Sequence, residues 1–432
     1  MRRILLVIYH IFSVLVVSAQ TDDQKLSNFT FHFMNTVVQQ GHESFTPPYS
    51  GIKSLVSDAE TQITVRNTWF LGKRLSKNTS IYINPELAGG SGLSGVAGIA
   101  GFPNGEAFRV GSGAPKVYLA RAFIRHQIML NDEKETFENT VNHLKEELST
   151  KRITLTAGKF SLLDYFDGSK YANDGRTQFM NWALMTGGAY DFASDTRGNT
   201  WGFNAEYFVP GRVIRFALTT PSSTPNGPQF DYNFPKALST NFDIRQDFKL
   251  FSVPAVIGFT AFHNSTLGAK FNDVINTQPD SVANHRRAYG VKYGFVLNIE
   301  QKLSKWAWFV TGSWADGKTE NWGFTQIDHS LNAGAVMFGN SWRRPYDEVG
   351  IAGVINGLSQ DQRNYLARGG NGFIIGDGKL NYAGEGAFEV YYSIQFTKNI
   401  FLTFDYQYIW NMAFNADRGN IGVWGIRSHV QL

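Results

Sequence analysis

The side chains best suited to chemistry in this sequence are charged groups that alternate with apolar ones. Arg66, Glu86, Arg121 and Arg125 each occur in a short segment in which every second residue is apolar. Guanidinium and carboxylate groups offer several hydrogen-bond donors or acceptors to a polar solute. They also pair readily with one another, because their charges are opposite. Two interpretations therefore stand for each group: contact with a solute, or ion pairing that keeps the protein wall rigid.

Patterns that would indicate a cofactor, a metal or catalysis are weak in this chain. Residues 90–95 match the glycine spacing of a dinucleotide-binding loop, but no βαβ unit surrounds them. The nine histidines are scattered, and no His-Glu-x-x-His sequence is present. Ser428 and His429 are adjacent, which places them on opposite faces of a strand and prevents a Ser–His catalytic pair there. We therefore expect no cofactor, no metal site and no enzymatic activity.

The C-terminal region indicates which elements position the charged groups. In residues 388–396 every second side chain is apolar, and polar side chains stand between them. The same alternation resumes in residues 402–410 and again in residues 424–432. A period of two is typical of β-strands. Strands of about ten residues with one aromatic, apolar face and one polar face are typical of the wall of a membrane-spanning β-barrel.

Further segments with this alternation are spread along the chain, at residues 63–71, 81–86, 120–128, 201–207, 291–299 and 306–314. Ala120 and Ile124, for example, are expected to face lipid, opposite Arg121. Charges mostly occupy the polar positions, because a charge that faces lipid at mid-depth costs about 2–4 kcal/mol. At roughly 26 residues for a strand and its connection, the sequence predicts an all-β, antiparallel transmembrane barrel of about 16 strands, with roughly 14 or 18 as alternatives.

The N-terminus is typical of an exported protein. Two arginines precede an apolar run at residues 4–17, and Val17-Ser18-Ala19 is a small-residue cleavage site. The run is too short to cross a hydrocarbon layer of about 30 Å as a helix. We expect residues 1–19 to be a signal peptide and residues 20–432 to form a single barrel domain.

Composition agrees with this architecture. Aromatic residues make up 15% of the chain, and a barrel can place them against lipid and at the two membrane interfaces. Cysteine is absent, so disulfides and thiolate metal sites cannot form. The formal net charge of +4 is small for 432 residues and does not indicate binding to nucleic acid. The aromatic content alone would also allow a soluble carbohydrate-binding lectin.

Several stretches between the expected strands are irregular or helical. In residues 131–151, four apolar side chains recur at helical spacing, which predicts an amphipathic helix. Residues 178–185 and 358–368 also predict short helices. Long loops are expected at residues 89–115, 221–235 and 270–287. Such loops lie outside a barrel or fold into its lumen.

Short motifs follow one another in a specific order along most of the chain. They are Gln40-Gly41-His42, Pro48-Tyr49-Ser50-Gly51, Phe70-Leu71-Gly72-Lys73-Arg74-Leu75, Tyr82-Ile83-Asn84-Pro85-Glu86, Gly101-Phe102-Pro103-Asn104-Gly105-Glu106, Ala120-Arg121-Ala122-Phe123, Gly158-Lys159-Phe160-Ser161, Asp164-Tyr165-Phe166-Asp167, Phe179-Met180-Asn181-Trp182 and Asn415-Ala416-Asp417-Arg418-Gly419. In this order they resemble the carbohydrate-selective porin family of the OprB type. The resemblance implies a monomeric barrel of about sixteen strands. It also implies a place among the lipids of a Gram-negative outer membrane and the passage of sugars and related polyols.

The polar strand positions and the family-like motifs together select candidate pore-lining, substrate-binding residues: Arg66, Glu86, Glu106, Arg121, Arg125 and Lys159. Lys159 shares its strand parity with Ile153 and Leu155, which we expect to face lipid. Trp182 joins the set, because a loop folded into the barrel would present it to a sugar. The alternative for Trp182 is a hydrophobic plug that packs the loop against the wall.

We therefore predict passive, carbohydrate-selective diffusion of small sugars through a water-filled lumen. Charged and amide groups would exchange water for sugar hydroxyls, and aromatic faces would contact the C–H surfaces of the ring. Binding must stay weak enough for release. The alternatives are a general channel or a channel for another solute and, less favoured, an outer-membrane barrel enzyme.

Overall fold

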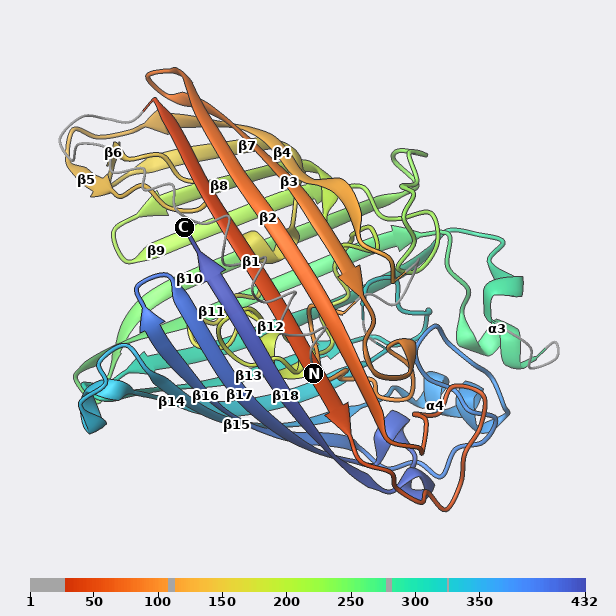
Figure 1. Ribbon diagram of the computed structural model, residues 1–432. Coiled ribbons are helices and arrows are strands. Elements are labelled where there is room, and N and C mark those ends of the chain that lie inside the picture. The colour runs from red at the N-terminus through yellow and green to blue at the C-terminus, as the bar shows by residue number, and fades with distance from the viewer. Residues whose placement is uncertain (1–27, 108–112, 277–281, 325) are drawn as a thin grey trace.

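The computed structural model describes residues 28–107, 113–276, 282–324 and 326–432. Within these residues the chain forms a closed antiparallel barrel in which β1 (Phe29–His42) pairs with both β2 (Glu60–Ser76) and β18 (Asn420–Gln431) (Figure 1). The barrel has sixteen strands, as the sequence predicts. The remaining wall strands are β3 (Thr79–Gly90), β4 (Lys116–Met129), β7 (Arg152–Phe160), β8 (Thr200–Val209), β9 (Arg212–Thr219), β10 (Leu238–Leu250), β11 (Val253–Thr266), β12 (Gly290–Lys302), β13 (Trp306–Ala315), β14 (His329–Phe338), β15 (Glu348–Gly357), β16 (Glu385–Thr397) and β17 (Ile400–Trp410). The expected signal peptide, residues 1–19, lies outside the described residues.

Side chains alternate between the two faces of the wall, which confirms the period-two interpretation. On β17, Phe404, Tyr406 and Tyr408 are 42–47% exposed on the outside of the barrel. The intervening Asp405 and Gln407 are buried on the inside. The outer row is the apolar surface that the sequence analysis expects to face lipid, and the inner row places polar groups in the lumen, where they can be hydrated or paired.

The two ends of the barrel differ. The wall begins at Phe29 and finishes at Gln431 at the same end, where neighbouring strands are joined by short turns such as residues 77–78 and 251–252. We call this the turn end. Long connections, including the expected loop at residues 221–235, join the strands at the opposite end, which we call the loop end.

Helices in the described residues are short. α4 (Gln360–Ala367) confirms the helix predicted for residues 358–368. The helix predicted for residues 178–185 is reduced to α2 (Trp182–Met185). Residues 270–287, expected to be a loop, contain α3 (Phe271–Ile275). Among the described residues no helix has both the length and the apolar character needed to span a membrane.

The connection between β4 and β7 is an exception to the short turns. The amphipathic helix predicted for residues 131–151 is wrong, because the segment forms a small hairpin of β5 (Lys134–Phe137) and β6 (Glu146–Ser149). The hairpin tip folds into the lumen, where Leu144 is fully buried. There Asn142 exchanges two amide hydrogen bonds with Asn84 of β3, at 2.8 and 3.0 Å. The apolar residues of this segment therefore do not form the single apolar face that an amphipathic helix would have.

The loop between β7 and β8, residues 161–199, enters the lumen, and we call it the inward loop. Glu389 on β16 accepts hydrogen bonds from the backbone amides of Met180 and Asn181, at 2.6 and 2.9 Å. Side chains on β11, β13, β14 and β17 also hydrogen-bond to the loop. Because these anchors come from strands spread around the barrel, they hold the loop across the lumen and satisfy its buried backbone groups.

Candidate functional site

Three neighbouring strands bring charged side chains to the same level of the lumen. In the register, Thr68 on β2 is opposite Glu86 on β3, and Asn84 on β3 is opposite Arg121 on β4. Arg66 lies two residues before Thr68 and therefore points to the same side of β2. The parity of the strands thus places two arginines and a glutamate, far apart in sequence, close together in the lumen.

A β-bulge sets the direction of Arg121. The β3–β4 register passes from the pair Asn84–Arg121 to the pair Pro85–Leu119, so Ala120 has no partner across the ladder. Ala120, expected to face lipid, is instead only 1% exposed. In a regular strand Arg121 would share the lipid-facing side with Leu119, which is 41% exposed. The extra residue turns Arg121 into the lumen, and the re-aiming of a side chain is a common role of bulges.

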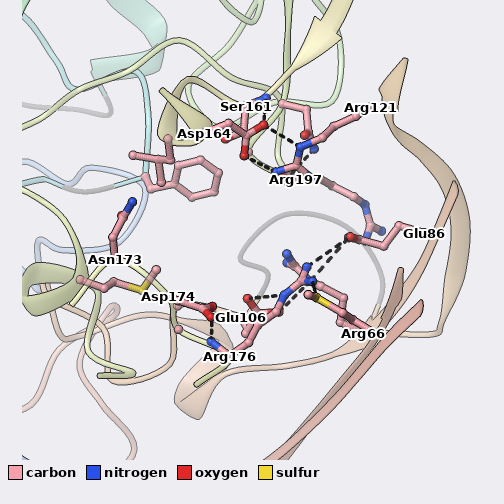
Figure 2. A pocket seen from close by; sticks show the side chains of 18 of the residues that line it. Arg66, Glu86, Glu106, Arg121, Ser161, Asp164, Asn173, Asp174, Arg176 and Arg197 are labelled. Carbon is pink, nitrogen blue, oxygen red and sulfur yellow. Dashed lines mark hydrogen bonds and ion pairs between the residues drawn. The ribbon is translucent and has the colours of Figure 1, made fainter. Parts of the chain in front are cut away.

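A cavity of about 300 Å³ lies among these side chains. The inward loop adds Arg176 to its wall, and the loop after β3 adds Glu106. Arg66 Nε lies 2.8 Å from Glu106 and 3.5 Å from Glu86, while Arg176 lies 3.5 Å from Glu86 and 3.7 Å from Glu106. Two arginines and two glutamates therefore form a ring of four ion pairs on one side of the cavity (Figure 2).

A second charged pair faces this ring across the opening (Figure 2). Arg121 donates two hydrogen bonds to Asp164, at 2.7 and 2.6 Å. The Asp164 carboxylate also accepts a bond from the Ser161 amide at 3.2 Å, which fixes the turn η2 (Leu162–Asp164) that begins the inward loop. The bidentate geometry holds both side chains in one orientation.

Arg197, at the far end of the inward loop, adds a further positive group to the cavity wall. Its guanidinium lies over the Tyr118 ring, 4.2 Å from the ring centre. Burial and the nearby positive charge of Arg66 lower the pKa of Arg197. The group remains charged at neutral pH, because arginine is not deprotonated in proteins under ordinary conditions.

Sequence reasoning does not select Arg176, Arg197 or Asp164 as site residues. All three lie in the inward loop, whose course has no period that could assign side chains to the lumen. For Arg176 and Asp164 the available signal is their position in or beside the family-like motifs that begin at Asp164 and Phe179. Arg197 has no comparable signal in the sequence.

Trp182 lines the cavity, but other aromatic rings cover it. Phe102 stacks on it at 5.1 Å, Phe192 at 6.2 Å, and Phe324 lies at 4.9 Å between ring centres. Trp182 is 5% exposed, whereas Phe324 is only half-buried. This packing favours the plug interpretation, in which Trp182 joins the inward loop to its neighbours and contributes an edge to the cavity.

Arg125 lies in the lumen but does not line this cavity. Its guanidinium is 5.1 Å from the Tyr82 ring centre and 5.2 Å from that of Phe123. It donates a hydrogen bond to the Asn142 carbonyl at 2.9 Å. Arg125 therefore holds the tip of the β5–β6 hairpin against the wall.

Lys159 is also outside the cavity. Its backbone has the same parity as Ile153 and Leu155, as noted from the sequence, and the preceding Gly158 has a φ of +135°. The ammonium group pairs with Asp195 of the inward loop at 2.9 Å and donates to a wall carbonyl at 3.1 Å. Lys159 thus joins one end of the inward loop to the barrel wall.

The cavity can bind a neutral, polyhydroxylated solute. Its positive and negative groups are balanced, with Arg66, Arg121, Arg176 and Arg197 opposite Glu86, Glu106, Asp164 and Asp174. Hydroxyls can exchange hydrogen bonds with such paired groups without leaving a buried charge uncompensated. Among the residues that the structure describes, no group of His, Asp and Glu is arranged to hold a metal ion.

Solved structures support the same architecture. The high-pH structure of Pseudomonas putida OprB aligns with 94% of this chain and 94% of its own, at 14% identity and a TM-score of 0.68. The low-pH structure of that protein covers 94% and 93% of the two chains, at 10% identity and a TM-score of 0.50. The outer membrane channel DcaP of Acinetobacter baumannii covers 96% and 100%, at 9% identity and a TM-score of 0.51. At these identities the likeness shows the fold alone.

Sequence comparison identifies the family. Among curated proteins none matches the chain. The family model described as "Carbohydrate-selective porin, OprB family" matches residues 53–432, which is most of the chain and includes the candidate residues Arg66 to Trp182. This confirms the family resemblance seen in the sequence and, with it, the expected outer-membrane location. The protein belongs to the OprB family of carbohydrate-selective porins, the sugar channels of the Gram-negative outer membrane.

Proposed function

We propose that small carbohydrates cross the barrel by passive diffusion through the cavity between Arg66, Glu86, Glu106 and Arg121, with Arg176 as a further contact. The observation that carries this proposal is the ring of shared ion pairs facing the Arg121–Asp164 pair across the opening (Figure 2). A cavity of about 300 Å³ is at the lower end of the range of about 300–1,000 Å³ found for small-molecule sites.

The shared pairs explain how binding can be specific and weak together. Arg66 and Arg176 each contact both Glu86 and Glu106, and three of the four distances are between 3.5 and 3.7 Å. These contacts are longer than good hydrogen bonds. A sugar hydroxyl can therefore replace one of them while the remaining contacts keep each charge compensated, so that the sugar is bound briefly and released.

The other candidates have supporting roles in this proposal. Arg125 positions the β5–β6 hairpin, whose residues Val141 and Asn142 line the cavity. Lys159 holds the inward loop through Asp195. Trp182 shapes the cavity from within its aromatic cluster, and the half-buried Phe324 offers the more accessible ring for the C–H surface of a sugar.

We further propose that the protein works as a monomer embedded in outer-membrane lipids, with its turn end toward the periplasm. The sheet closes on itself within one chain, so no second chain is needed to complete the barrel wall. Short periplasmic turns and longer external loops are usual for such barrels. The exposed aromatic rows, such as Phe404 and Tyr406, supply the lipid-facing surface.

Diffusion through this lumen needs no catalytic step. The Ser428–His429 pair supports this proposal, because His429 faces the lumen, 1% exposed and 2.9 Å from the Thr36 hydroxyl, while Ser428 lies on the other face of β18. The adjacent residues are thus held apart by the strand geometry, as the sequence analysis expects.

Liposome swelling tests the proposal against a general channel. Liposomes that contain the purified protein should swell faster in neutral sugars than in uncharged amino acids of similar size. A general channel would admit both solutes at rates set by size alone, and this result would contradict carbohydrate selectivity. Absence of swelling in any sugar would contradict sugar passage itself. Protein-free liposomes are the control.

A further inference from the structure

A second cavity lies beside the first, on the side of the turn end. It has a volume of about 530 Å³ and is lined by the inward loop, by Gly211 and its neighbours at the β8–β9 turn, and by parts of β10, β11 and β12. Leu163, Asp164 and Asn173 line both cavities. The two cavities are therefore direct neighbours, and these three residues form the junction between them.

The junction contains an acceptor that nothing in the described chain satisfies. The side-chain oxygen of Asn173 is buried and accepts no hydrogen bond from the described residues. A buried acceptor without a partner is costly, and a small rotation of the half-buried Asn173 side chain toward the cavities would let a hydroxyl group of a solute satisfy it. Asp164, on the same junction, keeps 31% of its side chain exposed while it pairs with Arg121. Figure 2 shows Asn173 at the margin of the first cavity, away from Glu86 and Arg66.

The wall of the second cavity offers the same kind of groups as the first. Arg245 lies 3.3 Å from Glu300, and both line this cavity. Lys170 and Asp247 are exposed charged groups in the wall, and neither has an ion-pair partner among the described residues. Their side chains can therefore turn toward a solute without breaking a pair.

Apolar surface is also present in the second cavity. Tyr165, Val213 and Val256 line it alongside the charged groups. A pyranose ring has polar edges and less polar C–H faces, so a mixed wall of this kind can contact both parts of it. Four cationic side chains (Lys170, Arg212, Arg215 and Arg245) and three acidic ones (Asp164, Asp247 and Glu300) line the cavity. Arg215 is already paired with Glu206 and Asp243, so the wall carries little net charge, which favours an uncharged sugar over a sugar acid or phosphate.

We propose that the second cavity is a second carbohydrate-binding subsite, which a neutral sugar occupies on the turn-end side of Asp164 and Asn173. The inference rests on the proposed function and extends it, since it divides the passage into two weak sites in series. A monosaccharide occupies one site at a time, whereas a disaccharide spans the junction and contacts both. Several weak sites let a solute enter and leave more readily than a single tight one.

Blockade of single-channel current by D-glucose and by maltose, each added to one side of a planar bilayer at a time, tests the second subsite. The double variant Lys170→Ala/Asp247→Asn alters only the second cavity, and Asn173→Ala alters the junction. Both should raise the dissociation constant for maltose by roughly three- to tenfold, since each loses one or two hydrogen bonds. Glucose added at the turn end should show a similar loss with the double variant. Lys249→Ala, which removes an exposed charge at the turn end outside both cavities, should leave block unchanged.

The outcomes separate this inference from the proposed function. If neither sugar blocks the unaltered protein, the proposed function fails and the second subsite with it. Suppose instead that both sugars block the unaltered protein, and that the double variant and Asn173→Ala show the same dissociation constants as the unaltered protein from either side. The second subsite is then refuted, and the proposed function stands. Open-channel conductance without sugar, and the difference in gel migration between unheated and heated samples, verify that each variant is folded.

Discussion

Glu86 shows how one residue in this lumen depends on several others. Its carboxylate accepts a hydrogen bond from Thr68 at 2.7 Å and another from the Tyr118 hydroxyl, and it contacts Arg66 and Arg176 at 3.5 Å each. The hydrogen bonds from Thr68 and Tyr118, which are strand residues, fix the position of the carboxylate. Arg66 and Arg176 both form ion pairs with it. The charge of Glu86 therefore sets the electrostatic balance of the passage.

Glu86→Gln should make the pore more anion-selective and weaken sugar block by a few fold. The substitution keeps the shape of the side chain but leaves the positive charges of Arg66 and Arg176 less compensated. Reversal potentials in a salt gradient and sugar titration of the current measure the two effects. Glu43→Gln, on an exposed loop-end residue outside both cavities, is the matched control. Unchanged selectivity and unchanged block would show that Glu86 does not face the passage.

Asp167 gives the inward loop a pH dependence. Its carboxylate accepts a hydrogen bond from the Gly187 amide at 2.6 Å, and burial raises its pKa to about 7. In an unfolded chain the pKa is about 3.9. Between these values the folded loop binds more protons than the unfolded one, so the contribution of Asp167 to stability is present at low pH and is lost as pH rises through about 7.

Asp167→Asn should remove the pH dependence of loop stability. The side-chain oxygen of the substituted residue can still accept the hydrogen bond from the Gly187 backbone amide, but the side chain no longer titrates. We expect the current of the unaltered protein to become noisier between about pH 5 and about pH 8 as the loop loosens, and the variant to stay equally quiet over this range. Noise that rises equally in both proteins would exclude Asp167 as the cause. Asp58→Asn, at an exposed carboxylate outside both cavities and outside the inward loop, serves as the control for loss of charge.

Residue parity could be predicted from the sequence only where the strands are regular. Arg66 and Glu86 occupy the lumen face that the alternation assigns them. Arg121 also lies on the lumen face that the alternation with Ile124 assigns it, whereas Ala120, expected to face lipid, is buried because of a bulge that the apolar pattern does not reveal. Arg197 lies in the non-periodic inward loop, where position follows from hydrogen bonds to distant strands and not from local sequence.

At the scale of elements, the β5–β6 hairpin shows why local spacing is an incomplete guide. Residues 131–151 carry apolar side chains at helical intervals, but Leu144 packs beneath Tyr82 and its amide donates to the Tyr82 hydroxyl at 3.4 Å. Asn142 is held by Asn84 and Arg125. Side chains of the wall thus form hydrogen bonds with backbone groups of the hairpin, which in a helix would bond to one another. Tertiary contacts override the local pattern.

Replacing residues 131–150 by Asn-Gly should widen the passage without preventing assembly. The Leu130 amide donates to the Lys151 carbonyl at 2.9 Å, so the strands already lie close enough for a two-residue hairpin turn. Removal of the hairpin takes Val141 and Asn142 out of the cavity wall. Single-channel conductance should increase, and block by sugar should weaken. Conductance equal to that of the unaltered protein would show that the hairpin does not limit the passage.

At the scale of the whole molecule, the two faces of the barrel wall differ in polarity, although apolar side chains also pack the inward loop inside the barrel. The outer surface carries rows of exposed aromatic and aliphatic side chains, while buried acids and amides face the lumen. Sequence alternation predicts this arrangement, because each strand position has only two sides and lipid excludes charge from one of them. The course of the long loops could not be predicted in the same way, since loops have no such two-sided constraint.

Phe404→Asp should impair insertion of the barrel. Phe404 is 46% exposed on the lipid-facing side of β17, and a carboxylate there loses apolar contact and enters hydrocarbon, at a cost of about 2–3 kcal/mol. The yield of folded barrel in liposomes, read from gel migration without heating, measures the effect. Ser304→Asp, in the exposed turn between β12 and β13, introduces the same charge outside the wall and should fold normally. Equal yields would contradict the lipid-facing assignment.

The central claim is that sugars pass through the hydrated cavity bounded by Arg66, Glu86, Glu106 and Arg121. Because the chain has no cysteine, Val141→Cys places a single reactive thiol in that cavity. A charged, water-soluble thiol reagent should lower the single-channel current of this variant, and millimolar D-glucose should slow the reaction by occupying the same space. A thiol that stays unreactive, or one that reacts at the same rate with and without sugar, would contradict the account.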